Sequence, residues 1–289
     1  MEDSGMSISS LRYNLQSAIT RRALNSNESA LQQAVSRLSS GKKYVGTEDA
    51  PASYSILEVM QSILGTSKQG VINAQNGISL LDTADAALSN IERIFTDISV
   101  LAEDSSNGVW TDEQRTVFNN QAQQLLSIVD NISQSTNFLG TPLIDGTMEP
   151  LTLQLGITNS EFDILTIEMP SMRTSALTNG LTTPSGNAID LSTQESALAS
   201  VANVKTVLTN VRGERSNIGA VQNAVETTIR HISAMNNETE STISTIGDAD
   251  VALEMEAYKN STARIQASQY MFSVAMESTS RLAQLIQSI

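Results

Sequence analysis

The longest hydrophobic pattern in the chain lies between residues 197 and 246, where positions alternate in steps of four and three residues. This seam consists of Ala197, Val201, Val204, Leu208, Val211, Arg215, Ile218, Gln222, Val225, Ile229, Ile232, Asn236, Thr239, Ile243 and Ile246. Most of these residues are apolar, no proline interrupts them, and an average spacing of 3.5 residues is the coiled-coil period. The pattern predicts a helix about 75 Å long, which requires equally long partners to cover its apolar face.

A second seam is apolar at every step and predicts another long helix. It consists of Leu81, Ala84, Leu88, Ile91, Phe95, Ile98 and Ala102. Burying each side chain contributes about 1–3 kcal/mol, whereas fixing the backbone costs about 1–2 kcal/mol per residue. Because these quantities are of similar size, the helix is not expected to persist without a partner along its seam.

A third helix is predicted after Thr111, which is followed by Gln114 at the spacing of a capping box. Its apolar positions are Phe118, Ala122, Leu125, Val129 and Ile132. The turn before this helix contains Trp110, which is expected to close over the turn rather than to bind a ligand.

Each end of the chain also predicts an amphipathic helix. The N-terminal helix carries Ile8, Leu11, Leu15, Leu24, Leu31 and Leu38 and is expected to end at Gly41, a suitable C-terminal cap. The C-terminal helix begins near Val251 and carries Ile265, Phe272, Leu282 and Ile286. The first helix is basic and the last is acidic, so they could pair, although the basic residues could equally form a solvated face.

The middle of the chain has a different period. Leu151, Leu153 and Leu155 alternate, as do Phe162 and Ile164 and, one step out of phase, Leu165, Ile167 and Met169. This pattern predicts a β-hairpin with a bulge near Ile164 and Leu165. Residues 178–187 form a Gly/Pro/Thr linker. The predicted fold is therefore mainly α, a long antiparallel helical bundle or coiled-coil rod with a small β-hairpin region in the middle.

Composition narrows the functional classes. The net charge of −14 argues against general nucleic-acid binding, which requires neutralisation of phosphates. The absence of cysteine excludes disulfides and thiol chemistry. No apolar run reaches about 18 residues, so no membrane span is expected. The N-terminus lacks the layout of a secretory signal peptide, so export would use another route.

No catalytic constellation is present in the sequence. His231 is the one histidine, and no thiol or second imidazole accompanies it. It is expected to lie on a helix surface. Asp248 and Asp250 are expected to cap a helix rather than to bind metal or perform catalysis. The sequence therefore predicts neither an enzyme nor a cofactor.

The terminal helices allow two interpretations. Binding to a membrane surface is disfavoured, because the last helix is acidic and its polar face is rich in Ser, Thr and Gln. Packing against other copies is favoured, since uncovered terminal seams would associate head to tail and form a helical filament if the rotation does not close a ring. Met271 and Met276 are expected to serve packing rather than to form a binding surface.

Motifs at both ends resemble bacterial flagellin. They are Leu38-Ser39-Ser40-Gly41, Asp49-Ala50, Asn76-Gly77-Ile78-Ser79-Leu80-Leu81, Thr83-Ala84-Asp85-Ala86-Ala87-Leu88, Ser106-Asn107-Gly108, Thr136-Asn137-Phe138, Leu153-Gln154-Leu155-Gly156, Met172-Arg173-Thr174-Ser175-Ala176-Leu177, Gly219-Ala220-Val221-Gln222-Asn223, Ile246-Gly247-Asp248-Ala249-Asp250 and Ala267-Ser268. The resemblance covers nearly the whole chain from Met6. The tail at residues 270–276 departs from the family's Gln/Ala-rich tail.

The resemblance implies a subunit of the extracellular flagellar filament, exported through the growing filament. It implies that the terminal helices are disordered in the monomer and fold on assembly. Residues 1–5 would be an extension, 6–46 and 247–289 the inner tube, 47–139 and 192–246 the outer rod, and 140–191 the hairpin and short surface linker. The implied partners are further copies of the chain, the hook-associated junction and cap proteins, an export chaperone and the type III export apparatus, with no nucleic acid and no membrane insertion.

The resemblance also assigns residues to roles. Those implied for inner-tube assembly are Ile8, Leu11, Leu15, Leu24, Leu31, Leu38, Ile265, Phe272, Leu282 and Ile286. Those expected in the rod core are Leu81, Leu88, Ile91, Phe95, Ile98, Phe118, Leu125, Val129, Val201, Val204, Leu208, Val211, Ile218, Val225, Ile229 and Ile232. The counterparts of the site read by the flagellin-sensing Toll-like receptor are Asp97, Leu101 and Gln121.

The sequence leaves two alternatives to a flagellin open. The hook–filament junction protein resembles flagellin at both ends, and residues 47–51 have some similarity to it, whereas residues 76–88 and 219–223 favour flagellin. Many flagellins carry Arg and Glu where this chain has Asp97 and Gln121, so weak or absent activation of the receptor is expected. An enzyme held on a coiled-coil scaffold is disfavoured because no site is present and the central insertion is short.

Overall fold

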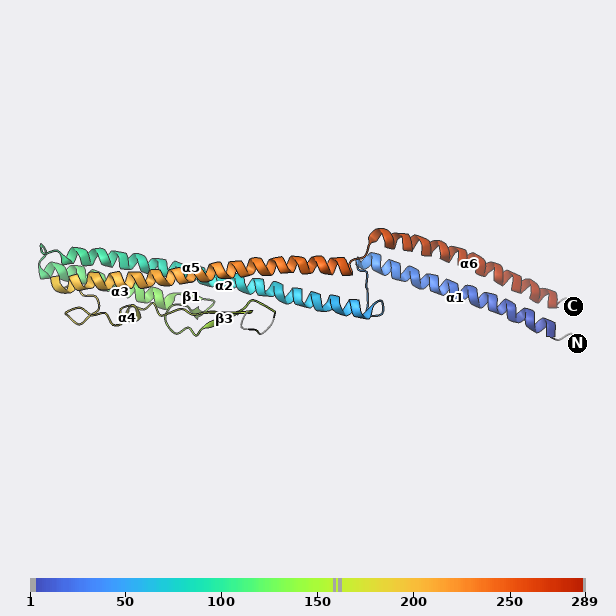
Figure 1. Cartoon of the computed structure of the whole chain (residues 1–289), viewed down its shortest axis with the longest axis horizontal. Helices are drawn as coiled ribbons and strands as arrows, with labels where there is room; N and C mark the ends of the chain where they lie inside the picture. The colour runs from blue at the N-terminus through green and yellow to red at the C-terminus, as the bar shows by residue number, and fades with distance from the viewer. Residues whose placement is uncertain (1–3, 158–159, 161–162, 288–289) are drawn as a thin grey trace. The chain divides into compact units, whose positions relative to one another are not determined.

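The computed structural model describes residues 4–157, 160 and 163–287 (Figure 1). Side chains are not described for residues 4–17, 278–279, 282–283 and 285–287. The elements, in order, are α1 (Ser4–Ser40), α2 (Pro51–Ser106), α3 (Asp112–Ser135), β1 (Asn137–Phe138), β2 (Thr141–Pro142), β3 (Leu151–Gln154), β4 (Ile164–Ile167), α4 (Thr174–Leu177), α5 (Gln194–Gly247) and α6 (Val251–Gln287). The predicted fold class, mainly α with a small β region, is confirmed.

The chain forms two compact units. One contains residues 1–62 and 238–289, and the other contains residues 63–237. Helices α2 and α5 contribute residues to both units. The borders near residues 46 and 247 that the resemblance implies for the inner tube and the outer rod stay a prediction. Ser4 and Gly5 are already helical, so they do not belong to a loose extension, while residues 1–3 lie outside the described part.

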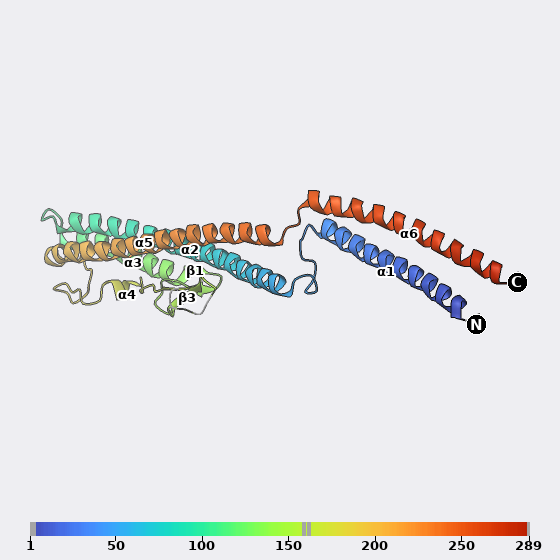
Figure 2. The ribbon, with the colours of Figure 1, turned by 45° about the vertical axis from the view of Figure 1, so that its right-hand side comes forward.

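The first unit is built on an antiparallel pair, α1 and α6, which lie side by side in Figures 1 and 2. A short backbone ladder joins their adjoining ends. The amide of Lys43 donates to the carbonyl of Gly247 at 2.7 Å, and the amide of Ala249 donates to that of Gly41 at 2.9 Å. Gly41 adopts a φ of +67°, as expected for the glycine that ends a helix.

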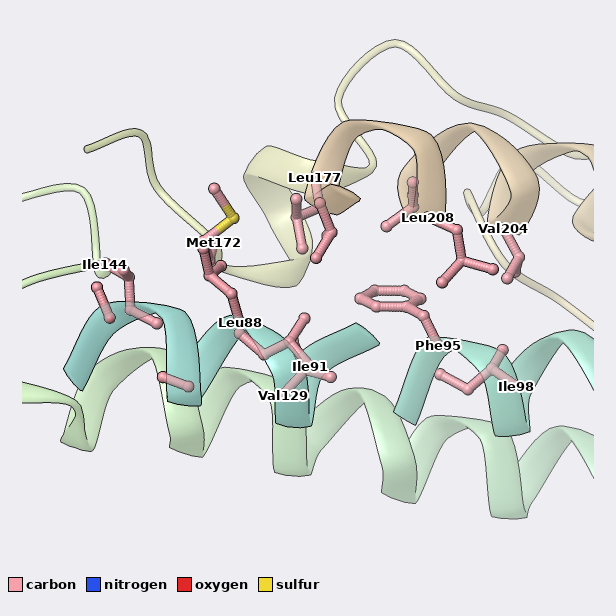
Figure 3. Close-up of a cluster of buried hydrophobic side chains, with 14 of the residues drawn as sticks. Leu88, Ile91, Phe95, Ile98, Val129, Ile144, Met172, Leu177, Val204 and Leu208 are labelled. Atoms are coloured by element: carbon pink, nitrogen blue, oxygen red, sulfur yellow. The ribbon is translucent and has the colours of Figure 1, made fainter. Parts of the chain in front are cut away.

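The second unit is held together by the apolar seams of α2, α3 and α5 (Figure 3). Every position of the all-apolar α2 seam is at most 1% exposed. In Figure 3, Phe95 of α2 points toward Val204 and Leu208 of α5, and Val129 of α3 lies below. Each position of the predicted α5 seam is buried or half-buried. The 3.5-residue period therefore identified the packed faces of both helices.

The predicted β-hairpin is present, with Leu151 opposite Ile167 and Leu153 opposite Leu165. The predicted position of the bulge is wrong, because pairing through Ile164 and Leu165 is regular. The bulge lies instead at Leu155 and Gly156, whose amides both donate to the carbonyl of Asp163, at 2.8 and 3.2 Å. Two residues thus oppose one. Phe162 lies outside the described residues.

The hairpin docks on a stripe of small residues along α2. A Cβ atom at Gly70 would lie 2.1 Å from the carbonyl oxygen of Leu155, and one at Gly77 would lie 2.3 Å from Cδ1 of Leu153. Between them, Ala74 is fully buried, and the side-chain amide of Asn73 donates to the carbonyl of Gln154 at 3.1 Å. The close approach of the hairpin backbone therefore requires glycine at position 70, whereas a side chain at position 77 would displace the end of the Leu153 side chain.

The pair β1–β2 and the short helix α4 were not predicted. Leu139 and Gly140 connect the two strands with φ values of 51° and 86°. Two consecutive positive φ angles match the twist of a tight hairpin. Leu139 is unusual in this turn, because positions with a positive φ favour Asn, Asp or Gly. Its side chain is apolar and 92% exposed.

The turn between α2 and α3 is fixed by polar contacts. Thr111 and Gln114 form the predicted capping box. The buried guanidinium of Arg115 donates to the carbonyls of Asn107 and Trp110, at 2.9 and 3.0 Å. The Trp110 ring meets Phe118 edge to face, with centroids 5.4 Å apart. Trp110 therefore closes the turn, as predicted.

Candidate assembly interface

Polar contacts fix the alignment of α1 against α6 at two levels. The side-chain amide of Asn27 donates to the hydroxyl of Ser268 at 3.1 Å. Nearer the connection, Arg37 donates to the carboxylate of Glu254 at 3.3 Å and lies 3.7 Å from Asp49. The structure thus contains an ion pair of the predicted kind, in which a basic residue of α1, Arg37, contacts an acidic residue of α6, Glu254. Its partners are partly buried, so solvent screens it less than an exposed pair.

The residues predicted for inner-tube assembly are only half-buried where their side chains are described. These are Leu24, Leu31, Leu38, Ile265 and Phe272. Ile8, Leu11, Leu15, Leu282 and Ile286 fall where side chains lie outside the described set. When only two helices pack together, each covers a single stripe of the other's surface. The remaining apolar surface of α1 and α6 therefore stays exposed to solvent.

Helix α6 carries the largest share of that exposed apolar surface. Its exposed large apolar residues are Val251, Leu253, Met255, Tyr258, Tyr270, Met271, Val274 and Met276. On α1, Ile19 and Val35 are 51% and 45% exposed. Isolated soluble chains rarely keep contiguous apolar surface in water, and such surface marks interaction sites. Met271 and Met276 are 55% and 52% exposed, and their role in packing stays a prediction.

The residues predicted for the rod core lie in two hydrophobic clusters. The larger cluster joins α2, α3 and α5 and contains most of the predicted core residues from Leu81 through Ile218, while Phe118, Leu125 and Val201 are partly buried and pack against it. The smaller cluster contains Val225 and Ile232, with Ile229 packed against it, and also Ala74 and Leu155. The hairpin thus covers the part of α2 and α5 that α3 does not reach.

Arg215, a polar residue at a seam position, is neutralised by two carboxylates of α2. Its Nε lies 2.8 Å from Oδ1 of Asp85, and its Nη1 lies 2.7 Å from Oε2 of Glu92. These hydrogen bonds, first to Asp85 and then to Glu92, raise the pKa of Arg215. Hydrogen bonds from Arg212 and then Arg215 lower the pKa of Glu92. The polar interruption of the seam is therefore an ion-pair network.

The residues considered for catalysis or metal binding lie where their side chains have structural roles or face solvent. His231 is exposed on α5. Asp250 begins α6, where its Oδ1 accepts from the amides of Ala252 and Leu253 at 2.9 and 3.2 Å, which is the predicted capping role. Within the residues that the structure describes, no three His, Cys, Asp or Glu side chains are grouped to hold a metal ion.

The three receptor-site counterparts lie on two helices. Asp97 on α2 and Gln121 on α3 are exposed, and Leu101 on α2 is half-buried against the larger cluster. Leu101 thus serves the rod core, while the two polar residues face solvent.

Across the described helices, none combines the length and the apolar character needed to span a bilayer.

The arrangement is that of a self-associating structural protein, with a covered rod core and a terminal helix pair whose apolar surface is only partly covered. Comparison with known sequences defines it further. The bacterial flagellin N-terminal helical region matches residues 11–149, and the bacterial flagellin C-terminal helical region matches residues 201–286. The chain belongs to the bacterial flagellin family, whose members are structural subunits of the extracellular flagellar filament rather than enzymes.

Individual relatives of the chain are also flagellins. A flagellin of Halalkalibacterium halodurans is 28% identical over 277 residues, covering 96% of this chain and 99% of the relative. A flagellin of Listeria monocytogenes is 27% identical over 282 residues, covering 95% and 98%. The solved structure of a putative flagellar hook-associated protein from Vibrio parahaemolyticus has a TM-score of 0.55 and 12% identity, covering 69% of this chain and all of that one. At this identity the likeness shows the fold alone. The matches to the flagellin family models and to the flagellin relatives do not favour the junction-protein alternative.

Proposed function

We propose that this flagellin polymerises head to tail through the paired helices α1 and α6. In this proposal, residues 6–46 and 247–289 form the inner tube, residues 47–139 and 192–246 form the outer rod, and residues 140–191 form its hairpin and surface linker. The single observation that carries the proposal is the set of large apolar side chains on α6 that stay exposed in the described part of the chain, because exposed apolar surface of this kind marks interaction sites.

A charge placed on this surface tests the proposal. Val274→Asp puts a carboxylate on an exposed apolar position of α6, and Asn260→Asp puts one on an exposed polar position of the same helix. We expect Val274→Asp to abolish elongation of filament seeds, measured by sedimentation and electron microscopy, and Asn260→Asp to leave it intact. Equal elongation by both variants would contradict the proposal. Unlimited elongation also separates a filament subunit from a junction protein, which stops after a short zone.

We further propose that α1 and α6 gain most of their stability on assembly. Their pairing residues are half-buried rather than enclosed, and long helices need tertiary packing to persist in water. Amide exchange on monomer and polymer tests this. Residues 6–46 and 247–289 should exchange rapidly in the monomer and slowly in the polymer. Equal protection in both states would show a self-sufficient pair.

We also propose specific partner proteins for this chain, on the basis of its membership of the flagellin family. They are the hook-associated junction and cap proteins, an export chaperone and the type III export apparatus, and the chain is proposed to have no enzymatic activity. The exposed apolar surface of α6 supports the need for a chaperone, because uncovered surface of this kind promotes premature association. Purified chain should remain soluble longer with its chaperone, measured by light scattering; unchanged aggregation would contradict this.

We propose that the Toll-like receptor for flagellin responds weakly to this chain. An exposed Asp97 carries the opposite charge to the Arg of many flagellins, and charge inversion at an interface centre is costly. Asp97→Arg together with Gln121→Glu should raise the response of reporter cells. A response of the unaltered chain as strong as that of a flagellin with Arg and Glu would overturn the proposal.

A further inference from the structure

The thioether of Met271 lies in an exposed, uncharged patch of α6. Met271 is 55% exposed, and its neighbours Tyr270 and Val274 are 70% and 43% exposed. With about 100° of rotation per residue, these three side chains share one side of the helix. No charged residue occurs between Arg264 and Glu277. A polar group created at Met271 would therefore lie between exposed apolar neighbours, with no charged residue in this stretch of α6 to pair with it.

We propose that Met271 is an oxidation site through which peroxide switches off assembly; this rests on the proposed role of α6 in contacts between copies. The sulfur lone pair attacks one oxygen of hydrogen peroxide, the O–O bond breaks, and the products are methionine sulfoxide and water. The thioether is oxidised and the peroxide is reduced.

Exposure makes this reaction selective among the methionines. Met169 and Met172, at 9% and 3% exposure, belong to the core of the second unit and are shielded from peroxide. Met255 and Met276 are 42% and 52% exposed on α6, and Met235 is 52% exposed on α5. Peroxide therefore modifies the exposed methionines of α6, together with Met235 of α5, without entering the hydrophobic clusters.

The consequence follows from where the sulfoxide would lie. A sulfoxide on an exposed side chain stays hydrated, so the fold of the single chain is retained. Covering the patch with another copy requires removal of that water from a polar S–O group, which is unfavourable unless a donor replaces it. Oxidation therefore acts on assembly and leaves the monomer folded, and enzymatic reduction of the sulfoxide restores assembly.

Matched variants isolate Met271. In M255L/M276L, Met271 is the one exposed methionine left on α6, and in M255L/M271L/M276L leucine replaces all three with similar volume and polarity. Met235 remains in both and reports the oxidant dose. Each full-length protein is treated with hydrogen peroxide, quenched with catalase, mapped by peptide mass spectrometry, and tested for elongation of seeds and for helical circular dichroism.

Oxidation should reduce the polymer yield of M255L/M276L several-fold without loss of monomer helix signal, and methionine sulfoxide reductases should restore the yield. The triple variant should keep its yield at the same Met235 sulfoxide level. Met271→Gln, which is polar without oxidation, should reduce the yield untreated. The proposal is overturned if complete oxidation at Met271 leaves the yield unchanged, if the triple variant loses as much, or if Met271→Gln polymerises fully. Failure of the untreated natural chain to polymerise would instead overturn the proposed function.

Discussion

The two units of the chain differ in how completely they cover their apolar residues. In the unit formed by residues 63–237, the α2 seam is at most 1% exposed, and three helices and a hairpin enclose it. In the unit containing α1 and α6, the predicted contact residues are half-buried, and large apolar side chains such as Tyr270 face solvent. The difference shows that one unit covers its apolar seam within a single chain, whereas the other leaves apolar side chains exposed, which is what the proposed contact with further copies would cover.

The largest effect is expected from the core of the enclosed unit. Phe95→Ala should destabilise it by about 3–5 kcal/mol, because a fully buried aromatic ring leaves a cavity that the neighbouring helices cannot fill. Chemical denaturation followed by circular dichroism measures the change. Val100→Ala, at a position 54% exposed on the same helix, is the control and should change stability little. Similar losses for both variants would remove the distinction between core and surface.

A second substitution tests the incomplete unit. Leu31→Ala removes a half-buried contact of α1, so the denaturation midpoint of the monomer should change little while seed elongation falls strongly. Sedimentation of polymer and denaturation of monomer give the two quantities. A large loss of monomer stability would show that the helix pair is already self-sufficient.

A third test concerns the charge network of the enclosed unit. The pKa of Glu92 is lowered by Arg212 and then Arg215, so its contribution to stability is present above the unfolded-state pKa and is lost as the pH falls through the lower folded-state value. Glu92→Gln should therefore melt below the natural chain at pH 7, and the gap should close as the pH falls below 4.5, the ordinary value. A gap that is constant with pH would contradict a role for the charge.

The smallest effect is expected at the tight turn of β1 and β2. Leu139 has a φ of 51°, a conformation that costs an ordinary L-residue about 1–2 kcal/mol and that Asn tolerates better. Leu139→Asn should raise the thermal midpoint of the enclosed unit slightly, with Leu139→Ala as a control that keeps the strain. A lower midpoint for Leu139→Asn would show that the exposed leucine makes a stabilising contact.

Sequence reasoning succeeded where a residue's role follows from its periodic position or its immediate neighbours. The seams of α2 and α5, the cap at Gly41 and the capping box at Thr111 are of this kind. It also placed Arg215 in the α5 seam, but the carboxylates that neutralise it lie 123 and 130 residues away. Such pairs depend on how two helices align, which local patterns do not encode.

The hairpin shows the same limit. Alternation predicted its strands, but the bulge depends on the carbonyl of Asp163, which accepts two amides, and on the Asp163 side chain, which lies close against Gly156. The docking stripe was missed although Gly70, Ala74 and Gly77 follow the four-and-three spacing of small residues. A heptad seam is recognised from large apolar side chains, so the heptad pattern does not reveal a contact surface that is formed by small residues. For α6, the period identified a helix but not which of its faces remains in solvent.

The Arg215 network has a mechanical consequence. A seam that repeats every seven residues can slide by one repeat and still match apolar positions, so apolar packing alone resists shear along the rod poorly. Asp85 and Glu92 are one repeat apart on α2, and Arg215 holds both. A slip of one repeat in either direction would leave one of these carboxylates without Arg215. This contact therefore fixes the register of α5 against α2, which the apolar seam alone leaves open to slip by one repeat.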